Sequence, residues 1–330
     1  MPDTIPEYLI YIHGVSRDNR QPHQPIYDDL HNGVRAVDTL FPNKNDWEAA
    51  KRCYVEWGWN YDNHLNPEGD HLLAEAQDQF ADKILSQVQA AKDSTINPLR
   101  MFLSPMRELM IKGFSDMFYY ASRDGKSSIR ATVASQIMRC IHDPLERGEP
   151  ISLTLLGHSA GSVVAFDFLF YLFAPQEILA SHESEKREFI EKQYDNINVN
   201  SETREDFKKL RKLAEQQKLR VRRLITFGSP ISMLAFRSNA VLEILAQGQQ
   251  LNPSHYGLDQ NPAVFGAALD GPRWINFWDK DDIIAWPVQF LMQDSPVVAD
   301  IYTDVADRIT TVHNKYWTSK VVYKEIAAHW

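Results

Sequence analysis

Short apolar runs that favour β-strands alternate along this chain with stretches of helical periodicity. The strongest strand candidates are residues 8–12, 52–57, 151–156, 221–227 and 273–278, and weaker ones are 297–302 and 308–312. Helical patterns cover residues 27–40, 128–142, 158–173 and 316–328. Strands that alternate with helices build parallel sheets with helices on their faces. The pattern therefore predicts a single α/β domain over residues 1–330, with a mainly parallel sheet flanked by helices.

Two longer segments interrupt this alternation. Residues 60–127 begin polar and become rich in Met and Phe, whereas residues 175–219 are dense in charges of both signs. The first segment leaves a strand, so it starts on the ligand side of a parallel sheet and is predicted to be a helical lid or acyl pocket. An ordinary helical pair that buries its apolar face is the alternative. The second segment leaves a helix on the far side and is predicted to be a charged, solvated helical hairpin or a partner contact.

Composition and charge exclude several classes of protein. The 330 residues carry a formal net charge of −9 without any offsetting basic cluster, which argues against nucleic-acid binding. Cys53 and Cys140 are too few for a disulfide framework and lack the spacing of a zinc site. The N-terminus lacks the pattern of a signal peptide, and the most apolar stretch, 162–174, is too short to span a bilayer. We therefore expect a soluble protein of a reducing compartment, the cytoplasm, without a transmembrane segment; export without a cleaved signal stays open.

The most informative stretch is a predicted strand that runs into Gly157-His158-Ser159-Ala160-Gly161 and then into an apolar helix. This is the G-x-S-x-G pattern in the strand–turn–helix context of a nucleophile elbow. Its basis is steric, because small neighbours let the backbones pass while the turn lifts the Oγ of Ser159 clear of the sheet. The helix N-terminus then faces an oxyanion. The alternative is a glycine-rich helix N-terminus of another α/β fold that binds an anion.

At these residues the chain resembles the α/β-hydrolase superfamily of serine esterases and lipases. The resemblance extends over most of the chain apart from the two insertions, and it implies an α/β-hydrolase fold. The first predicted strand begins at Tyr8, so the two leading strands usual in the family are missing and the sheet is compact. Phe227-Gly228-Ser229-Pro230, after a later strand, also resembles a lipase-like pattern that shapes a turn.

The family places its residues in the order Ser, acid, His, and this order singles out a base. Only His182, His255, His313 and His329 follow Ser159. His182 lies in the charged segment, His255 precedes the best acid candidate, and His329 is penultimate, where fraying is expected. His313 remains, in a sequence similar to the His-x-x-Tyr-Trp neighbourhood of lipase-like members, and a structural histidine is the alternative.

The acid is expected just past a strand and before His313. Residues 274–278 lead into Asp279-Lys280-Asp281-Asp282, and the segment that begins at Asp282 is similar to the Asp-x-Val-Pro turn of class 3 lipases. We expect Asp282 to be the triad acid, with Asp279, nearest the strand end, as second choice. The acid would hold the His313 tautomer and stabilise the imidazolium. The other carboxylates are expected to cap the turn.

An oxyanion hole needs two backbone donors. One is expected to be the N–H of Ala160, which follows the nucleophile. By the resemblance, the other is the N–H of Val15, because Ile12-His13-Gly14-Val15 is similar to the His-Gly-x motif of the family. Gly14 would then permit the turn, and His13 would be structural rather than catalytic.

The resemblance implies a serine hydrolase that cleaves carboxylic esters through an acyl-enzyme, without a cofactor. The substrate would be a small-molecule ester or a lipid, with thioesters and phospholipid acyl bonds as alternatives. His158, Met233 and Leu234 are expected to contact it. A catalytically silent hydrolase-fold binding or scaffold module is the alternative of a different class, and the presence of every triad position argues against it. The sequence does not identify a protein partner.

A metal site was weighed at one polar stretch. Asp62, His64, Asp70 and His71 lie close together in the sequence and carry atoms that ligate cations. Loop residues of this kind are more often hydrogen-bonded surface, so no metal is predicted.

Overall fold

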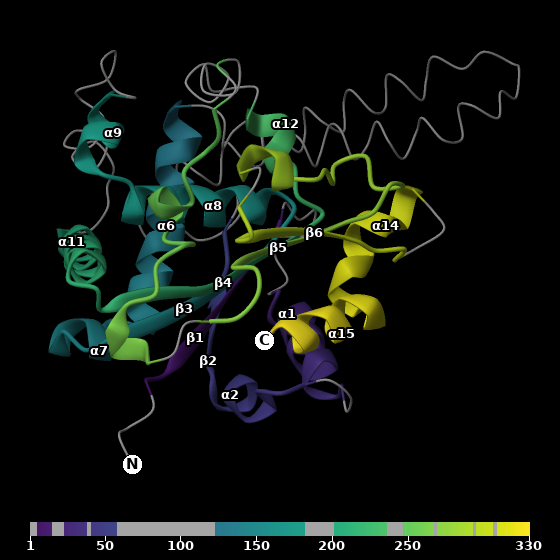
Figure 1. Cartoon of the computed structure of the whole chain (residues 1–330), viewed down its shortest axis with the longest axis horizontal. Coiled ribbons are helices and arrows are strands. Elements are labelled where there is room, and N and C mark those ends of the chain that lie inside the picture. Colours follow the sequence, from purple (N-terminus) through teal and green to yellow (C-terminus); the bar gives the residue numbers. More distant parts are fainter. Residues whose placement is uncertain are drawn as a thin grey trace, which may run out of the picture.

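The computed structural model describes residues 5–14, 23–37, 41–57, 123–181, 201–235, 247, 249–266, 269–292, 295–305 and 309–330. These residues form one all-parallel sheet of six strands with helices on both faces (Figure 1). The strands are β1 (Glu7–Ile12), β2 (Lys51–Val55), β3 (Ile151–His158), β4 (Leu219–Phe227), β5 (Trp274–Trp278) and β6 (Val298–Tyr302). The α/β class, the strong strand predictions and the weaker one at 297–302 are therefore confirmed.

The order in which strands are added to the sheet reverses between β1 and β3: β2 lies on one side of β1, and the later strands lie on the other. The strands lie in the order β2-β1-β3-β4-β5-β6, and β1 pairs with β3 from Glu7 opposite Ser152 to Ile12 opposite Gly157. In an open parallel sheet, the crevice outside the carboxyl ends of the strands at such a reversal is the usual place for a ligand. This topology brings the residues after Ile12 next to the residues after Gly157, although the two motifs are far apart in the sequence.

Helices cover both faces of the sheet (Figure 1). One face carries α1 (Gln24–Arg35), α2 (Lys44–Ala49) and α15 (Lys320–His329), and the other carries α6 (Arg123–Cys140), α8 (Ala160–Phe173) and α11 (Ser201–Glu215). The shorter helices are α7 (His142–Arg147), α9 (Gln176–Ser181), α12 (Ile231–Ala235) and α14 (Ile309–Lys315). Single 3₁₀ turns lie at η2 (Pro253–Tyr256), η3 (Ala263–Phe265), η4 (Gln289–Met292) and η5 (Tyr316–Thr318).

Strand β1 shows why the sheet has two cores. Tyr8, Ile10 and Ile12 belong to the core beneath α6, α8 and α11, whereas Leu9 and Tyr11 belong to the core beneath α1 and α15. Successive side chains of a strand point to opposite faces, so a strand covered on both sides is apolar at every position. The uninterrupted apolar run in the sequence is the consequence.

Helix α11 corrects part of the prediction for residues 175–219. It is helical and charged, as expected, but Phe207, Leu210 and Leu213 are buried and belong to the core beneath α8. Their spacing of three residues places them along one stripe of the helix, and the charged residues cover the remaining surface. This helix is therefore part of the scaffold rather than a fully solvated arm.

The prediction of a strand at residues 308–312 is wrong, because α14 begins at Ile309. As a helix, this segment buries Val312 and leads into the buried Tyr316 four residues later, on the same side. The predicted lid or acyl pocket at residues 60–127 lies outside the described residues, apart from the first residues of α6. Among the described helices, none combines the length and the apolar character that a bilayer span needs.

The end of α15 is held by arginines of β4. The guanidinium of Arg222 lies 4.3 Å over the ring of Trp330 and donates to the Trp330 carbonyl at 3.0 Å. Arg223 donates to the carbonyl of His329 at 2.8 and 3.1 Å. The last carbonyls of a helix lack intrahelical partners and carry partial negative charge, so these cations stabilise the helix end. They also fix the end of α15 against β4.

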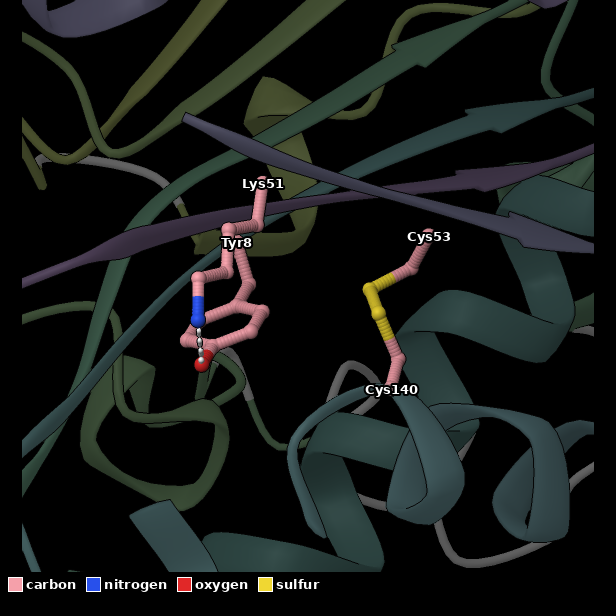
Figure 2. The surroundings of a disulfide bond; sticks show 4 residues. All are labelled: Tyr8, Lys51, Cys53 and Cys140. Atoms are coloured by element: carbon pink, nitrogen blue, oxygen red, sulfur yellow. Dashed lines mark hydrogen bonds between the residues drawn. A yellow bond between two sulfur atoms is a disulfide. The ribbon is translucent and has the colours of Figure 1, made fainter. Parts of the chain in front are cut away.

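A disulfide bond joins Cys53 in β2 to Cys140 at the end of α6 (Figure 2). The Nζ of Lys51 and the phenol of Tyr8 lie beside it, 3.4 Å apart. One bond is not a framework, but disulfides are rare in reducing compartments. The pairing therefore argues against the reducing compartment that the sequence predicts. Spacing in the sequence could not reveal it, because the two residues are 87 positions apart and meet only through the packing of α6 on β2.

Loss of this disulfide should lower the free energy of unfolding by about 4 kcal/mol, because a cross-link over so long a loop restricts the unfolded chain. The measurement is urea unfolding of the wild type and of a double variant with Cys53→Ala and Cys140→Ala. A reductant should lower the midpoint of the wild type and leave that of the double variant unchanged. Equal midpoints for the two proteins in oxidising buffer would contradict the prediction.

Candidate active site

Ser159 occupies a strained turn between β3 and α8. Its φ of 51° and ψ of −129° lie in a region that residues with a side chain rarely adopt. The flanking glycines permit the turn, since a Cβ on Gly157 would lie 2.6 Å from the Cα of Ser162. A Cβ on Gly161 would lie 2.2 Å from the carbonyl oxygen of His13. The G-x-S-x-G spacing is thus required by the close approach of β1, β3 and α8.

Hydrogen bonds fix this turn on both sides. The N–H of Ser159 donates to the carbonyl of Phe227 at 3.0 Å, which ties the turn to the end of β4. Its carbonyl accepts from the Oγ of Ser162 at 2.5 Å, and that hydroxyl lies 2.8 Å from the Oγ of Ser229. Helix α8 begins at Ala160, and the first N–H groups of a helix have no intrahelical acceptor. The N–H of Ala160, the expected oxyanion donor, therefore has no acceptor within the helix.

His313 and Asp282 form a hydrogen-bonded pair. The Nδ1 of His313, in α14, donates to the Oδ2 of Asp282 at 2.8 Å, while the Oδ1 of Asp282 accepts from the N–H of Ile284 at 3.0 Å. Asp282 is buried, which by itself would raise its pKa, but the bond and charge of His313 lower that pKa below its usual value. The carboxylate thus stays ionised and fixes the His313 tautomer, with the proton on Nδ1.

Asp279, the second choice for the acid, has other partners. Its Oδ1 accepts from the N–H of Asp281 at 2.9 Å, and its Oδ2 accepts from the N–H of Val305 at 2.8 Å. Its carbonyl accepts from the N–H of Asp282 at 3.1 Å. Oδ1 therefore caps the turn that presents Asp282, and Oδ2 ties this turn to the segment after β6.

The imidazole of His313 lies beside the elbow. Gly228 follows Phe227, whose carbonyl binds Ser159, and it has a φ of 61°. A Cβ on Gly228 would lie only 3.0 Å from the Cε1 of His313. The Nε2 of His158, the residue before Ser159, lies 2.6 Å from the carbonyl oxygen of His313. Contacts from both β3 and β4 thus bring His313 to the turn that holds Ser159.

The end of β1 completes this edge of the sheet. A Cβ on Gly14 would lie 2.5 Å from the Cβ of Ser159, so the chain after β1 passes directly over the elbow. His13 is buried, its Nδ1 contacts the carbonyl of Gly14, and its Nε2 accepts from the N–H of Trp57 at 3.1 Å. These contacts match a structural role. Val15, the other expected oxyanion donor, lies outside the described residues.

A second histidine and a glutamate support His13 and were missed by the sequence analysis. The ring of His23 stacks on that of His13 at 3.5 Å between centroids, with an angle of 9°. The Nδ1 of His23 lies 2.5 Å from the Oε2 of Glu56, and the backbone N–H of His23 donates to the Oε1 of Glu56 at 2.8 Å. Glu56 directly follows β2, which pairs with β1. The sequence could have indicated Glu56, because the carboxyl ends of adjacent parallel strands lie side by side.

Metal binding was considered for two clusters among the described residues, His13 with His23 and Glu56, and His142 with Glu146 and Asp206. In the first cluster the lone pairs of stacked rings lie in parallel planes and do not converge on one point. In the second, the ammonium of Lys209 contacts both carboxylates. We assign no metal to either. The stretch with Asp62, His64, Asp70 and His71 lies outside the described residues.

The residues expected to contact substrate fall in different environments. His158 is only 4% exposed, and its Nε2 faces the backbone of His313. Met233 is 37% exposed on α12. Trp286 is 45% exposed, and its backbone N–H donates to the carbonyl of Ser229 at 3.1 Å. Leu234 lies in α12, but its side chain lies outside the described part of the structure.

Comparisons of the chain with protein-family models, with curated proteins and with solved structures find no match. What the site can do therefore follows from its geometry.

Acid should destabilise the folded protein through its buried histidines. Burial lowers the pKa of His158 to about 3 and that of His31 to about 4, and it also lowers the pKa of His13. Between these lowered pKa values and pH 6.5, the histidines are protonated in the unfolded chain and neutral in the folded chain. The free energy of unfolding should therefore fall as the pH drops through this window, by about 1.4 kcal/mol per pH unit for each such histidine.

Urea unfolding between pH 4.5 and pH 7 measures this slope. His31 is a suitable residue for this test because it lies on α1, outside the candidate active site, and its Nδ1 lies 3.0 Å from the phenol oxygen of Tyr11. In the variant His31→Gln, the free energy of unfolding should fall with pH less steeply, by about 1.4 kcal/mol per pH unit, because one proton fewer is taken up on unfolding. Identical slopes in the two proteins would contradict the assignment of His31 as a buried neutral histidine.

Proposed function

We propose that this chain is a serine hydrolase of the α/β-hydrolase fold that cleaves carboxylic esters. The observation that carries the proposal is the hydrogen-bonded pair of His313 and Asp282 beside a serine held in a strained strand-to-helix turn. Such a constellation activates a hydroxyl for attack on an acyl carbon. The compact parallel sheet and its reversal beside Ser159 support the same fold.

In the proposed reaction, the Oγ of Ser159 attacks the ester carbonyl carbon while the Nε2 of His313 takes its proton. Asp282 remains ionised and stabilises the imidazolium through Nδ1. The negative charge that develops on the carbonyl oxygen is bound by the N–H of Ala160 and, from the loop after β1, by the N–H of Val15. Each such donor is worth about 3 kcal/mol of transition-state stabilisation.

Collapse of the tetrahedral intermediate breaks the bond to the alcohol, which leaves with the proton from His313. The acyl group then remains on Ser159 as an ester. Water attacks this acyl-enzyme, His313 takes a proton from the water and returns it to Ser159, and the carboxylic acid departs. Protons and electron pairs balance without an oxidant, a reductant or a metal.

The substrate proposed is an ester whose acyl part is apolar. Met233 and Trp286 expose apolar surface on the two segments that meet at Ser229, next to the turn after β4. The Oγ of Ser232 donates to the carbonyl of Pro287, which binds these segments together. Both lie at the carboxyl edge of the sheet, where an acyl chain bound at Ser159 would extend.

Substitution of Ser159 by Ala should lower the hydrolysis of a p-nitrophenyl ester by about 10⁴-fold or more, with folding retained. A fluorophosphonate probe should label the wild type and leave the variant unlabelled. Circular dichroism and the unfolding midpoint serve as controls for folding. Turnover like that of the wild type in a pure Ser159→Ala preparation would refute the nucleophile, and a folded wild type without labelling would favour a binding module.

Two matched carboxamide variants test the acid. Asp282→Asn should lower kcat by about 10⁴-fold, because an amide stabilises the wrong His313 tautomer. Asp279→Asn removes an acceptor from the turn, so its main effect should be on the unfolding midpoint, with a much smaller loss of kcat. Steady-state kinetics at matched protein quality measure both. The reverse ranking of the two losses in kcat would assign the role to Asp279.

A further inference from the structure

His158 lies where three segments of the site meet. It is the last residue of β3, directly before Ser159, and its ring packs near the rings of His313, Trp317 and Phe227, with centroids 4.8, 5.4 and 5.7 Å away. A Cβ on Gly14 would lie 3.2 Å from its Nδ1, so the chain after β1 passes on the other side. An apolar ring could fill this space, so packing alone does not explain a histidine here.

The protonation state of His158 defines its hydrogen bond. Burial and the nearby His313 lower its pKa to about 3, so the ring is neutral at pH 7 and carries one N–H. The carbonyl oxygen of His313, 2.6 Å from Nε2, is only an acceptor. The proton therefore lies on Nε2, and His158 donates to the backbone of His313.

This hydrogen bond holds His313, the proposed base, by its main chain rather than by its ring. The carbonyl of His313 lies in the last turn of α14, where helix carbonyls lack intrahelical partners. Asp282 fixes the ring of His313, and His158 fixes the backbone that carries it. Because residue 158 is adjacent to residue 159 in one rigid turn, the bond links the base directly to the nucleophile.

We propose that His158 is a positioning residue that sets the distance between Ser159 and His313 through its Nε2–H bond to the His313 carbonyl. This inference rests on the proposed hydrolase function. It replaces the expectation that His158 contacts substrate, because its polar edge faces the protein. A displacement of the base by a fraction of an ångström would slow proton transfer without weakening the binding of the ester.

The test compares two substitutions that differ in the donor. His158→Phe fills the space without an N–H, whereas the amide of Gln in His158→Gln restores a donor near the position of Nε2. With a p-nitrophenyl ester, His158→Phe should lower kcat by about 10- to 100-fold and change KM by less than about twofold. His158→Gln should recover most of that loss. His31→Phe, which replaces a buried histidine of α1, is the control for the general cost of such a change.

Proton NMR of the free protein provides a readout that needs no turnover. The Nδ1 proton of His313, shared with Asp282, should give a resonance far downfield that disappears in Asp282→Asn. It should be retained in His158→Gln and shifted or broadened in His158→Phe, while His31→Phe leaves it unchanged.

The outcomes separate the two proposals. A wild type that neither hydrolyses esters nor reacts with the fluorophosphonate overturns the hydrolase function, and the resonance still tests the positioning. An active wild type with equal kcat and an unchanged resonance in His158→Phe overturns the positioning and leaves the function in place. A rise in KM as the main effect would return His158 to substrate contact.

Discussion

The backbone of Ser159 is the constraint on which the rest of the site depends. A residue with a side chain at φ 51° carries a strain of about 1–3 kcal/mol, and such strain persists only where neighbours fix the chain from both sides. Here the ladder of β3 precedes the turn, α8 follows it, and the carbonyl of Phe227 holds its N–H. Because Gly161 passes within contact of the His13 carbonyl, β1 is locked into the same unit. One strained residue is thereby tied to three strands.

A hydrogen bond from a neutral histidine, His158, extends this rigid unit to His313. His13 and His158 are both buried with lowered pKa values, so neither carries a positive charge at neutral pH. Because His158 is neutral, it donates to the His313 carbonyl without placing a positive charge beside the pair of His313 and Asp282. The carboxylate of Asp282 is then the charged group that bonds the ring of His313.

Most strands and the chemical motif were predictable from the sequence, because both depend on local patterns. The apolar runs follow from burial on both faces, and the glycines around Ser159 follow from the turn itself. Residues 309–312 were misassigned because a short run of β-branched residues fits a strand or a buried helix equally well. The apolar stripe of α11 was not recognised in the sequence, because charged residues surround each of its members. His158, His23 and Glu56 acquired their partners only through the order of the strands.

The same order of strands explains how the residues on either side of segment 15–22 are held. Gln136 of α6 bonds both backbone groups of Glu56, at 3.0 and 2.6 Å, and the disulfide joins α6 to β2 at Cys53, three residues earlier. The end of β2 is thus fixed to α6 in two places, and the carboxylate of Glu56 then holds His23. His13 and His23 flank residues 15–22, which include the expected oxyanion donor. Helix α6, on the opposite face of the sheet from α1, therefore helps to fix His13 and His23, the residues on either side of that segment, through Trp57 and Glu56 at the end of β2.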